Sequence, residues 1–283
     1  MTSAITFDRL IDSQCLTSTD PADIFTDWQG AEECWLFASP HDDDIVCGAG
    51  LAFLTALALG VKTYAMITSD GRMGYCRPEH KDQIAAIRHE EAKASFEALG
   101  LPPENLFFLN FPDCDFARYA GRRLVNDVDQ EPRTIAGAVG LQNSYTWMLR
   151  KVRPTRLFLP SITDIHPDHQ LVTKELTISI FHAVGGIWPE LGEKIAGLPQ
   201  LYEYATYSNF LTPPTIRIRT SQELLEKKLA GIRAYQSQEQ IELLVDVQRK
   251  AGPKEFIREA RFDIFQPDQC DALFEPNPPV MPR

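Results

Sequence analysis

Short apolar runs alternate with longer helical patterns through the first two-thirds of this chain, and this alternation restricts the fold more than any other feature. The runs lie at 34–39 (CWLFAS), 62–69, 105–111 and 155–161, and each reads as a buried strand. Strands that alternate with helices are joined by right-handed crossovers, which build a parallel sheet covered on both faces. The sequence therefore predicts an α/β fold with a mostly parallel sheet and helices on both faces.

Periodicity and turn residues predict the remaining elements. Four helices are expected, over about 45–59, 81–99, 134–152 and 169–184. Gly100 is placed to end the second of these helices. In the final third we expect two strands at 201–208 and 215–220, an amphipathic helix at 221–236, and an extended proline-rich tail at 275–283.

The 283 residues show no internal repeat and no linker long enough to separate two domains. We therefore predict one α/β domain over 1–283, with a core at about 33–240 and a C-terminal extension at about 241–283. Whether the chain forms a homo-oligomer is left open by the sequence.

Charge and composition exclude several classes of protein. A net charge of −11 without any basic stripe argues against binding to nucleic acid or to an anionic membrane. The longest apolar stretch, 48–60, is too short for a membrane span, which needs about 20 residues. The N-terminus lacks a secretory pattern, and the six scattered cysteines include no C-x-x-C pair. A cytoplasmic protein with reduced thiols is expected.

Three adjacent aspartates follow the first predicted strand, in the stretch SPHDDD at 39–44. Adjacent carboxylates repel one another, so the cluster needs a cation nearby. A second polar loop follows the fourth strand, where His166, Asp168 and His169 stand in the motif HPDH. Because parallel strands bring their carboxyl ends to one edge of the sheet, the two loops can meet there.

Histidine and carboxylate from two loops are the donors that a divalent metal takes, and zinc is the first candidate. Iron and manganese accept the same mixed nitrogen and oxygen set. Either motif alone has a simpler interpretation: Asp44 could cap the following helix, and HPDH could form a turn. The two motifs together, at two strand ends of one sheet, favour a metal site. No G-x-G-x-x-G or G-x-S-x-G motif supports a dinucleotide-binding protein or a serine hydrolase.

These motifs resemble those of a known family. SPHDDDIVCGAG resembles the HPDDE-x-x-G signature, and HPDH its partner, in the PIG-L/LmbE family of zinc-dependent N-deacetylases. The resemblance extends from about 33 to 240 and implies a Rossmann-like fold of the LmbE type. Four further segments resemble the family: TSDGRMG (68–74), IRHEEAKASFEALGL (87–101), LFFLNFPDC (106–114) and KKLAGIRAYQSQ (227–238).

The resemblance implies a role for each matching residue. His41, Asp44 and His169 would hold the metal, and Asp43 would be the catalytic base. His166 would stabilise the oxyanion as a cation, oriented by Asp168.

The substrate would meet a second group of residues. The resemblance implies that Arg88 and Asp113 hold sugar hydroxyls, although a salt bridge between the two would account for them equally well. Arg72, in a loop at 70–78 that we expect to form one wall of the pocket, could meet a hydroxyl or a phosphate or could simply be solvated. We give no role to the aromatic segment 201–210, which we interpret as buried strand residues, or to His80, His89 and His182.

The chain departs from the family pattern at three points. Asp42 replaces the proline after the first histidine, and Ile45 replaces the usual glutamate. The tyrosine that some members carry just before HPDH is absent, and Thr-Asp-Ile stands there instead.

The resemblance implies a zinc-dependent hydrolase that removes an N-acetyl group from an amino sugar or amino-sugar conjugate. Two alternatives stay open: a metal-dependent amidase acting on a non-sugar N-acylated small molecule, and a non-catalytic, metal-stabilised sugar-binding protein.

Overall fold

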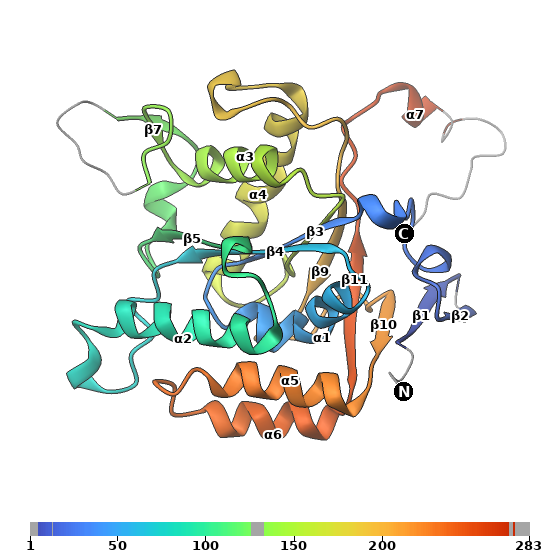
Figure 1. Cartoon of the computed structure of the whole chain (residues 1–283). Helices are drawn as coiled ribbons and strands as arrows, with labels where there is room; N and C mark the ends of the chain where they lie inside the picture. Colours follow the sequence, from blue (N-terminus) through green and yellow to red (C-terminus); the bar gives the residue numbers. More distant parts are fainter. Residues whose placement is uncertain (1–4, 13, 126–132, 272–273, 275–283) are drawn as a thin grey trace.

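A computed structural model describes residues 5–12, 14–125, 133–271 and 274 (Figure 1). Its main sheet has nine strands in the order β2-β1-β10-β11-β9-β8-β3-β4-β5. Their bounds are β1 Thr6–Ile11, β2 Gln14–Ser18, β3 Cys34–Ser39, β4 Lys62–Ser69, β5 Leu106–Phe111, β8 Arg156–Pro160, β9 Gln200–Tyr204, β10 Ile216–Arg219 and β11 Lys254–Ala260. A separate two-stranded sheet pairs β6 (Arg123–Leu124) with β7 (Ala138–Val139).

The sheet has a parallel half and an antiparallel half. Strands β9, β8, β3, β4 and β5 run parallel to one another. The four remaining strands join antiparallel, and β11 lies between β10 and β9. The parallel half confirms the predicted α/β fold. The segment predicted as a C-terminal extension supplies β11 to the interior of this sheet, and the division into core and extension stays a prediction.

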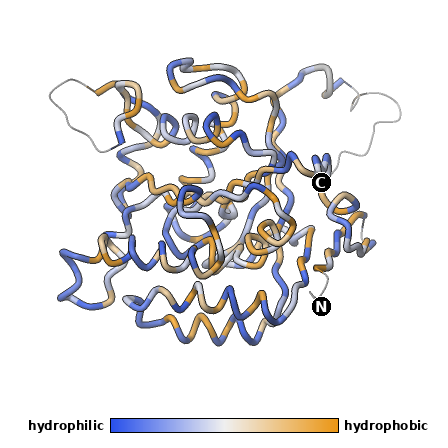
Figure 2. The backbone as a smooth tube through the Cα atoms, viewed as in Figure 1, coloured by the Kyte–Doolittle hydropathy of each residue, from blue (hydrophilic) through white to orange (hydrophobic). Residues whose placement is uncertain are grey.

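Helices cover both faces of the sheet, as expected (Figure 1). Their bounds are α1 Asp44–Ala58, α2 Ile84–Leu99, α3 Leu141–Val152, α4 Pro167–Gly185, α5 Gln222–Arg233, α6 Ile241–Ala251 and α7 Asp268–Asp271. Helices α3 and α4 pack together over one face, and α1, α2, α5 and α6 lie on the other. Figure 2 shows hydrophobic colour along the central strands, whereas α5 and α6 alternate between hydrophobic and hydrophilic.

Strand β3 separates two hydrophobic cores. Trp35 and Phe37 point into the core under α1 and α5, while Leu36 and Ala38 point into the core under α3 and α4. Successive side chains of a strand point to opposite faces, so a strand covered on both faces is apolar throughout. This explains why the run 34–39 was readable from sequence.

The predicted strands at 34–39 and 62–69 have the predicted bounds. The strand at 105–111 begins one residue later, and that at 155–161 is one residue shorter at each end. Gly100 ends α2 with a φ of 90°, a left-handed conformation that glycine adopts without a Cβ clash. The helix expected at 134–152 was wrong in its first part, because α3 begins only at Leu141. Gly140, at φ 136°, lies so close to Gly121 that a Cβ atom added to residue 140 would clash with the carbonyl oxygen of Gly121.

In the final third, the strand expected at 201–208 is shorter than predicted and ends at Tyr204. The proline-rich tail predicted at 275–283 lies outside the described residues. Strands β1, β2 and β11 and helix α6 were not predicted. Within the described part of the chain, none of the helices combines the length and apolar character needed to cross a membrane.

Candidate metal centre

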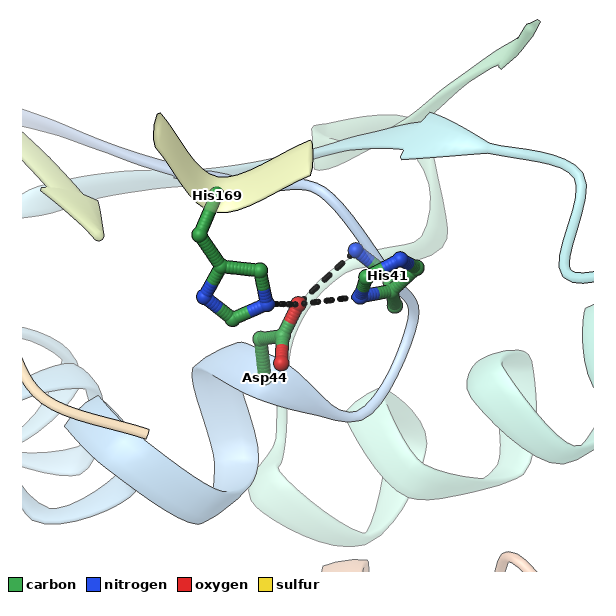
Figure 3. A group of neighbouring side chains, drawn as sticks. All are labelled: His41, Asp44 and His169. Carbon is green, nitrogen blue, oxygen red and sulfur yellow. Dashed lines mark hydrogen bonds and ion pairs between the residues drawn. The ribbon is translucent and has the colours of Figure 1, made fainter. Parts of the chain in front are cut away.

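The two predicted loops meet at the carboxyl edge of the parallel strands. Strand β3 ends at Ser39, so His41 lies in the turn that leads to Asp44, the first residue of α1. Strand β8 ends at Pro160, and His169 lies in the first turn of α4. In Figure 3 the imidazole rings of His41 and His169 lie on either side of the Asp44 carboxylate.

Three donor groups converge there. Oδ2 of Asp44 lies 3.2 Å from Nδ1 of His41 and 3.3 Å from Nε2 of His169. One donor atom from each residue lies within 4.8 Å of the other two. His41 is 8% exposed, Asp44 1% and His169 0%. The predicted ligands are therefore brought together and buried.

Several of these buried atoms have no hydrogen-bond partner among the described residues: His41 Nδ1, His169 Nε2 and Asp44 Oδ1. Buried polar atoms left unpaired are rare in folded proteins because each costs about 1–3 kcal/mol. A divalent cation bound by the two imidazole nitrogens and the Asp44 carboxylate would give both nitrogens a partner. The residues present thus fit a zinc-type metal.

Each histidine also contacts a carboxylate through its other nitrogen. Nδ1 of His169 lies 3.4 Å from Oδ2 of Asp164. Nε2 of His41 lies 3.3 Å from Asp113 and 3.5 Å from Asp168. Metal-ligating histidines are usually oriented in this way, with a carboxylate fixing which nitrogen faces the metal.

Asp164 was missed by the sequence analysis. It is buried, and its carboxylate also accepts hydrogen bonds from the backbone N–H groups of His166 (3.0 Å) and Tyr207 (3.2 Å). Its only sequence signal is its place two residues before the HPDH motif.

The charges in the centre shift the pKa values of its members. Burial would raise the pKa of Asp44, but the two histidines hold it well below its usual range. Burial would lower the pKa of His41, but Asp44, Asp113 and Asp168 raise it well above the usual value. Without a metal, this imidazole therefore binds a proton tightly, and a metal must compete with that proton.

Asp43, the predicted base, lines a cavity of about 200 Å³ beside the metal centre. Its Oδ2 lies 3.0 Å from Nη2 of Arg88. Arg88 is buried and donates hydrogen bonds to Asp42, so the alternative salt bridge between Arg88 and Asp113 is not what the structure contains. Burial raises the pKa of Asp42 to about 7, with Arg88 opposing the shift and Asp43 adding to it.

His166 is oriented differently from what was expected. The backbone N–H of Asp168 donates to Nδ1 of His166 at 3.2 Å, so that nitrogen is an acceptor. Burial and the neighbouring His41 and His169 lower the pKa of His166. The hydrogen bond leaves Nε2 as the nitrogen that carries the proton, and a cationic His166 at the oxyanion stays a prediction. Among the described contacts, the Asp168 carboxylate faces His41 and the N–H of Cys114.

The loop at 70–78 forms part of the cavity wall, as predicted, through Gly71, Met73 and Gly74. Arg72 does not reach this cavity. Its side chain is 55% exposed, donates to Asp70 at 2.6 Å, and borders a neighbouring cavity of about 300 Å³.

Tyr207 is a second residue that the sequence analysis missed. In the aromatic segment 201–210, Tyr202 and Tyr204 are buried strand residues, as interpreted. Tyr207 lies beyond the strand, and its ring centroid is 5.4 Å from that of His166 and 5.2 Å from that of His169. An isolated tyrosine after a strand carries no distinctive sequence signal.

Comparisons with known proteins agree with this geometry. A family model described as GlcNAc-PI de-N-acetylase (PIG-L) matches residues 36–181, more than half of the chain. No curated protein sequence matches the chain.

Similar solved structures include the conserved protein TT1542 from Thermus thermophilus, at 23% identity and a TM-score of 0.61, which covers 83% of this chain and 98% of that protein. An N,N'-diacetylchitobiose deacetylase from Pyrococcus horikoshii has 22% identity and a TM-score of 0.62, with 83% and 87% covered. GalB, a 4-carboxy-2-hydroxymuconate hydratase from Pseudomonas putida KT2440, has 19% identity and a TM-score of 0.62, with 83% and 98% covered. At these identities the likeness establishes a shared fold.

Proposed function

The chain belongs to the GlcNAc-PI de-N-acetylase (PIG-L) family, and on that premise we propose that it is a metal-dependent hydrolase that removes an N-acetyl group from an amino sugar or amino-sugar conjugate. The observation that carries the proposal is the buried trio of His41, Asp44 and His169 with a second aspartate, Asp43, on the adjoining cavity. The fold alone does not choose the reaction, since a deacetylase and a hydratase share it.

In this proposal His41 Nδ1, the Asp44 carboxylate and His169 Nε2 hold Zn²⁺, and Fe²⁺ or Mn²⁺ would find the same donors. Bound zinc would polarise the amide carbonyl and make a water molecule acidic. Asp164 keeps His169 in place, while Asp113 and Asp168 do the same for His41.

Asp43 takes the proton of the attacking water and returns it to the leaving amine. Its position supports this role, because the residue lines the cavity while the neighbouring Asp44 turns towards the histidines.

His166 donates a hydrogen bond through its Nε2–H group to the oxygen of the scissile carbonyl as negative charge develops there. A single well-placed donor of this kind contributes about 3–4 kcal/mol to catalysis. The Asp168 backbone N–H fixes the tautomer, and the Tyr207 ring packs against the imidazole. Asp113 and Arg88, which line the cavity, bind hydroxyl groups of the substrate in this proposal, as does Arg72, which lines the neighbouring cavity.

The test measures metal content and acetate release from N-acetylglucosamine derivatives on the same samples. The wild type should bind about one zinc per chain. Asp44→Ala and His169→Ala should lose both the metal and the activity. The control is His182→Ala, a histidine that packs against Trp188 away from the centre and should retain both.

The outcomes separate the site from the reaction. Bound zinc with no acetate release would reject the amino-sugar substrate and point to another N-acylated molecule or to sugar binding. A wild type that takes up no zinc, iron or manganese would reject the metal centre itself.

A further inference from the structure

Arg88 contacts two consecutive aspartates, Asp42 and Asp43, in different ways. Its Nε and Nη2 groups donate hydrogen bonds to Oδ1 of Asp42, at 3.1 Å and 2.5 Å. With Asp43 it makes an ion pair, Nη2 to Oδ2 at 3.0 Å, and among the described residues the hydrogen bonds of the guanidinium go to Asp42. One cation therefore contacts two carboxylates, of which only the second, Asp43, is the base in the proposed reaction.

The surroundings hold this arrangement from several sides. The guanidinium lies over the ring of Tyr235, with 5.0 Å between Cζ and the centroid, and the Tyr235 hydroxyl donates to the backbone carbonyl of Asp42. Gly71 passes close to the stem of Arg88, where an added Cβ would lie 3.2 Å from the Cβ of Arg88. Asp42 and Arg88 are each only 4% exposed. A buried guanidinium in such a site must keep a carboxylate partner.

Asp42 is a feature of this chain rather than of the family signature, which has a proline at that position. A proline offers no side-chain acceptor to Arg88. The usual glutamate three residues further on is also missing, because Ile45 fills that position and is packed into the hydrophobic core. The chain thus has one carboxylate fewer at 45 and one more at 42, and the additional carboxylate faces Arg88.

We infer that Asp42 is a positioning residue for the proposed deacetylation, on which this inference rests: it engages the hydrogen-bonding edge of Arg88 so that the guanidinium does not clamp the carboxylate of Asp43. Without the side chain of Asp42, the nearest acceptor for Nε and Nη2 is Asp43. A two-point hydrogen-bonded pair would hold that carboxylate against Arg88 and turn it away from the cavity.

The activity test uses Asp42→Ala, which removes the acceptor, and Asp42→Asn, which keeps an acceptor oxygen without the charge. Asp42→Ala should lower kcat for acetate release about 10- to 100-fold, because misplacing a catalytic group by about 1 Å has effects of this size. KM should stay within about twofold of the wild type. The kcat of Asp42→Asn should fall between those of the wild type and Asp42→Ala. Asp8→Ala, which removes a buried aspartate from an arginine-paired site on β1, is the control for a general loss of stability.

A double-mutant cycle with Arg88→Gln tests whether Asp42 acts through Arg88. In that background Asp42→Ala should change kcat by no more than about twofold, since the clamp has been removed. Effects of the two substitutions that simply multiply would overturn the inference, as would an Asp42→Ala enzyme with wild-type kcat.

The crystal structure of Asp42→Ala, which removes the acceptor, gives a readout that needs no activity. We expect Arg88 to donate to both carboxylate oxygens of Asp43. An Arg88 that keeps its position would overturn the inference. If the wild type releases no acetate, the proposed reaction fails, whereas this structure still decides whether Asp42 holds Arg88.

Discussion

Replacing Asp164 by asparagine should weaken metal binding without removing a metal ligand. The carboxylate is buried and has three partners: the Nδ1 group of His169 at 3.4 Å and two backbone N–H groups at 3.0 and 3.2 Å. An asparagine of the same size offers one acceptor oxygen and an NH₂ group in place of the second. At least one of the three donors must then face another donor.

The expected magnitude follows from these contacts. Loss of a residue that orients a metal-ligating histidine lowers metal affinity about 10- to 100-fold, or about 1.4–2.7 kcal/mol. The unsatisfied buried N–H group of His166 or Tyr207 would cost the fold about 1–3 kcal/mol. Both effects should therefore be present in Asp164→Asn, and they must be measured separately.

Zinc affinity is measured by competition with a chromophoric chelator, and the free energy of unfolding by urea denaturation of the metal-free protein. The control is Asp8→Asn, another buried aspartate whose replacement should cost stability and leave zinc affinity unchanged. A zinc dissociation constant for Asp164→Asn equal to that of the wild type would refute the reasoning. An equal loss of affinity in Asp8→Asn would show that stability, not orientation, is responsible.

Three further predictions concern stability. Although burial opposes the shift, hydrogen bonds from two arginines of β10 hold the pKa of Asp8 below its usual range. The contribution of Asp8 to stability is therefore present above about pH 4 and is lost as the pH falls through the lowered pKa. Urea titrations should show Asp8→Asn less stable than the wild type at neutral pH, and this difference in stability should close in acid. Glu33→Gln should cost about 3–5 kcal/mol on urea unfolding, because it leaves the fully buried, bidentate Arg156 without its charge partner, and a loss under about 1 kcal/mol would contradict this. Gly48→Ala should cost about 1–3 kcal/mol, since the new methyl group would lie 2.7 Å from the carbonyl oxygen of Ala205, and an unchanged melting temperature would argue against the packing described.

The parallel half of the sheet was predictable because its strands are buried on both faces. Such strands appear in the sequence as continuous apolar runs. Strand β11, KEFIREA, has the composition of a helix, with two glutamates, a lysine and an arginine in seven residues. It is a strand because β10 and β9 pair with it on either side, and that context cannot be read locally. Strand β11 was therefore missed for a physical reason.

The residues that we propose as metal ligands stand in sequence motifs, whereas the residues that orient them do not. His41, Asp44 and His169 stand in motifs whose spacing places them at two strand ends. Asp164 acts through the direction of its carboxylate, which depends on the path of the loop at 161–166 in space. Tyr207 reaches the same histidines from a distant segment after β9.

The three consecutive aspartates are compatible with burial because the turn from β3 to α1 sends their side chains in three directions. Asp42 receives the hydrogen bonds of Arg88, and Asp43 borders the cavity with Arg88 at one side. Asp44 turns to the two histidines. Asp42 and Asp43 thus share one arginine, whereas the charge of Asp44 is balanced by a metal ion or by protonated histidines. Loss of the metal should therefore leave Asp42 and Asp43 in contact with Arg88. The change should fall on Asp44, because the two histidines beside it can take up protons in place of the metal.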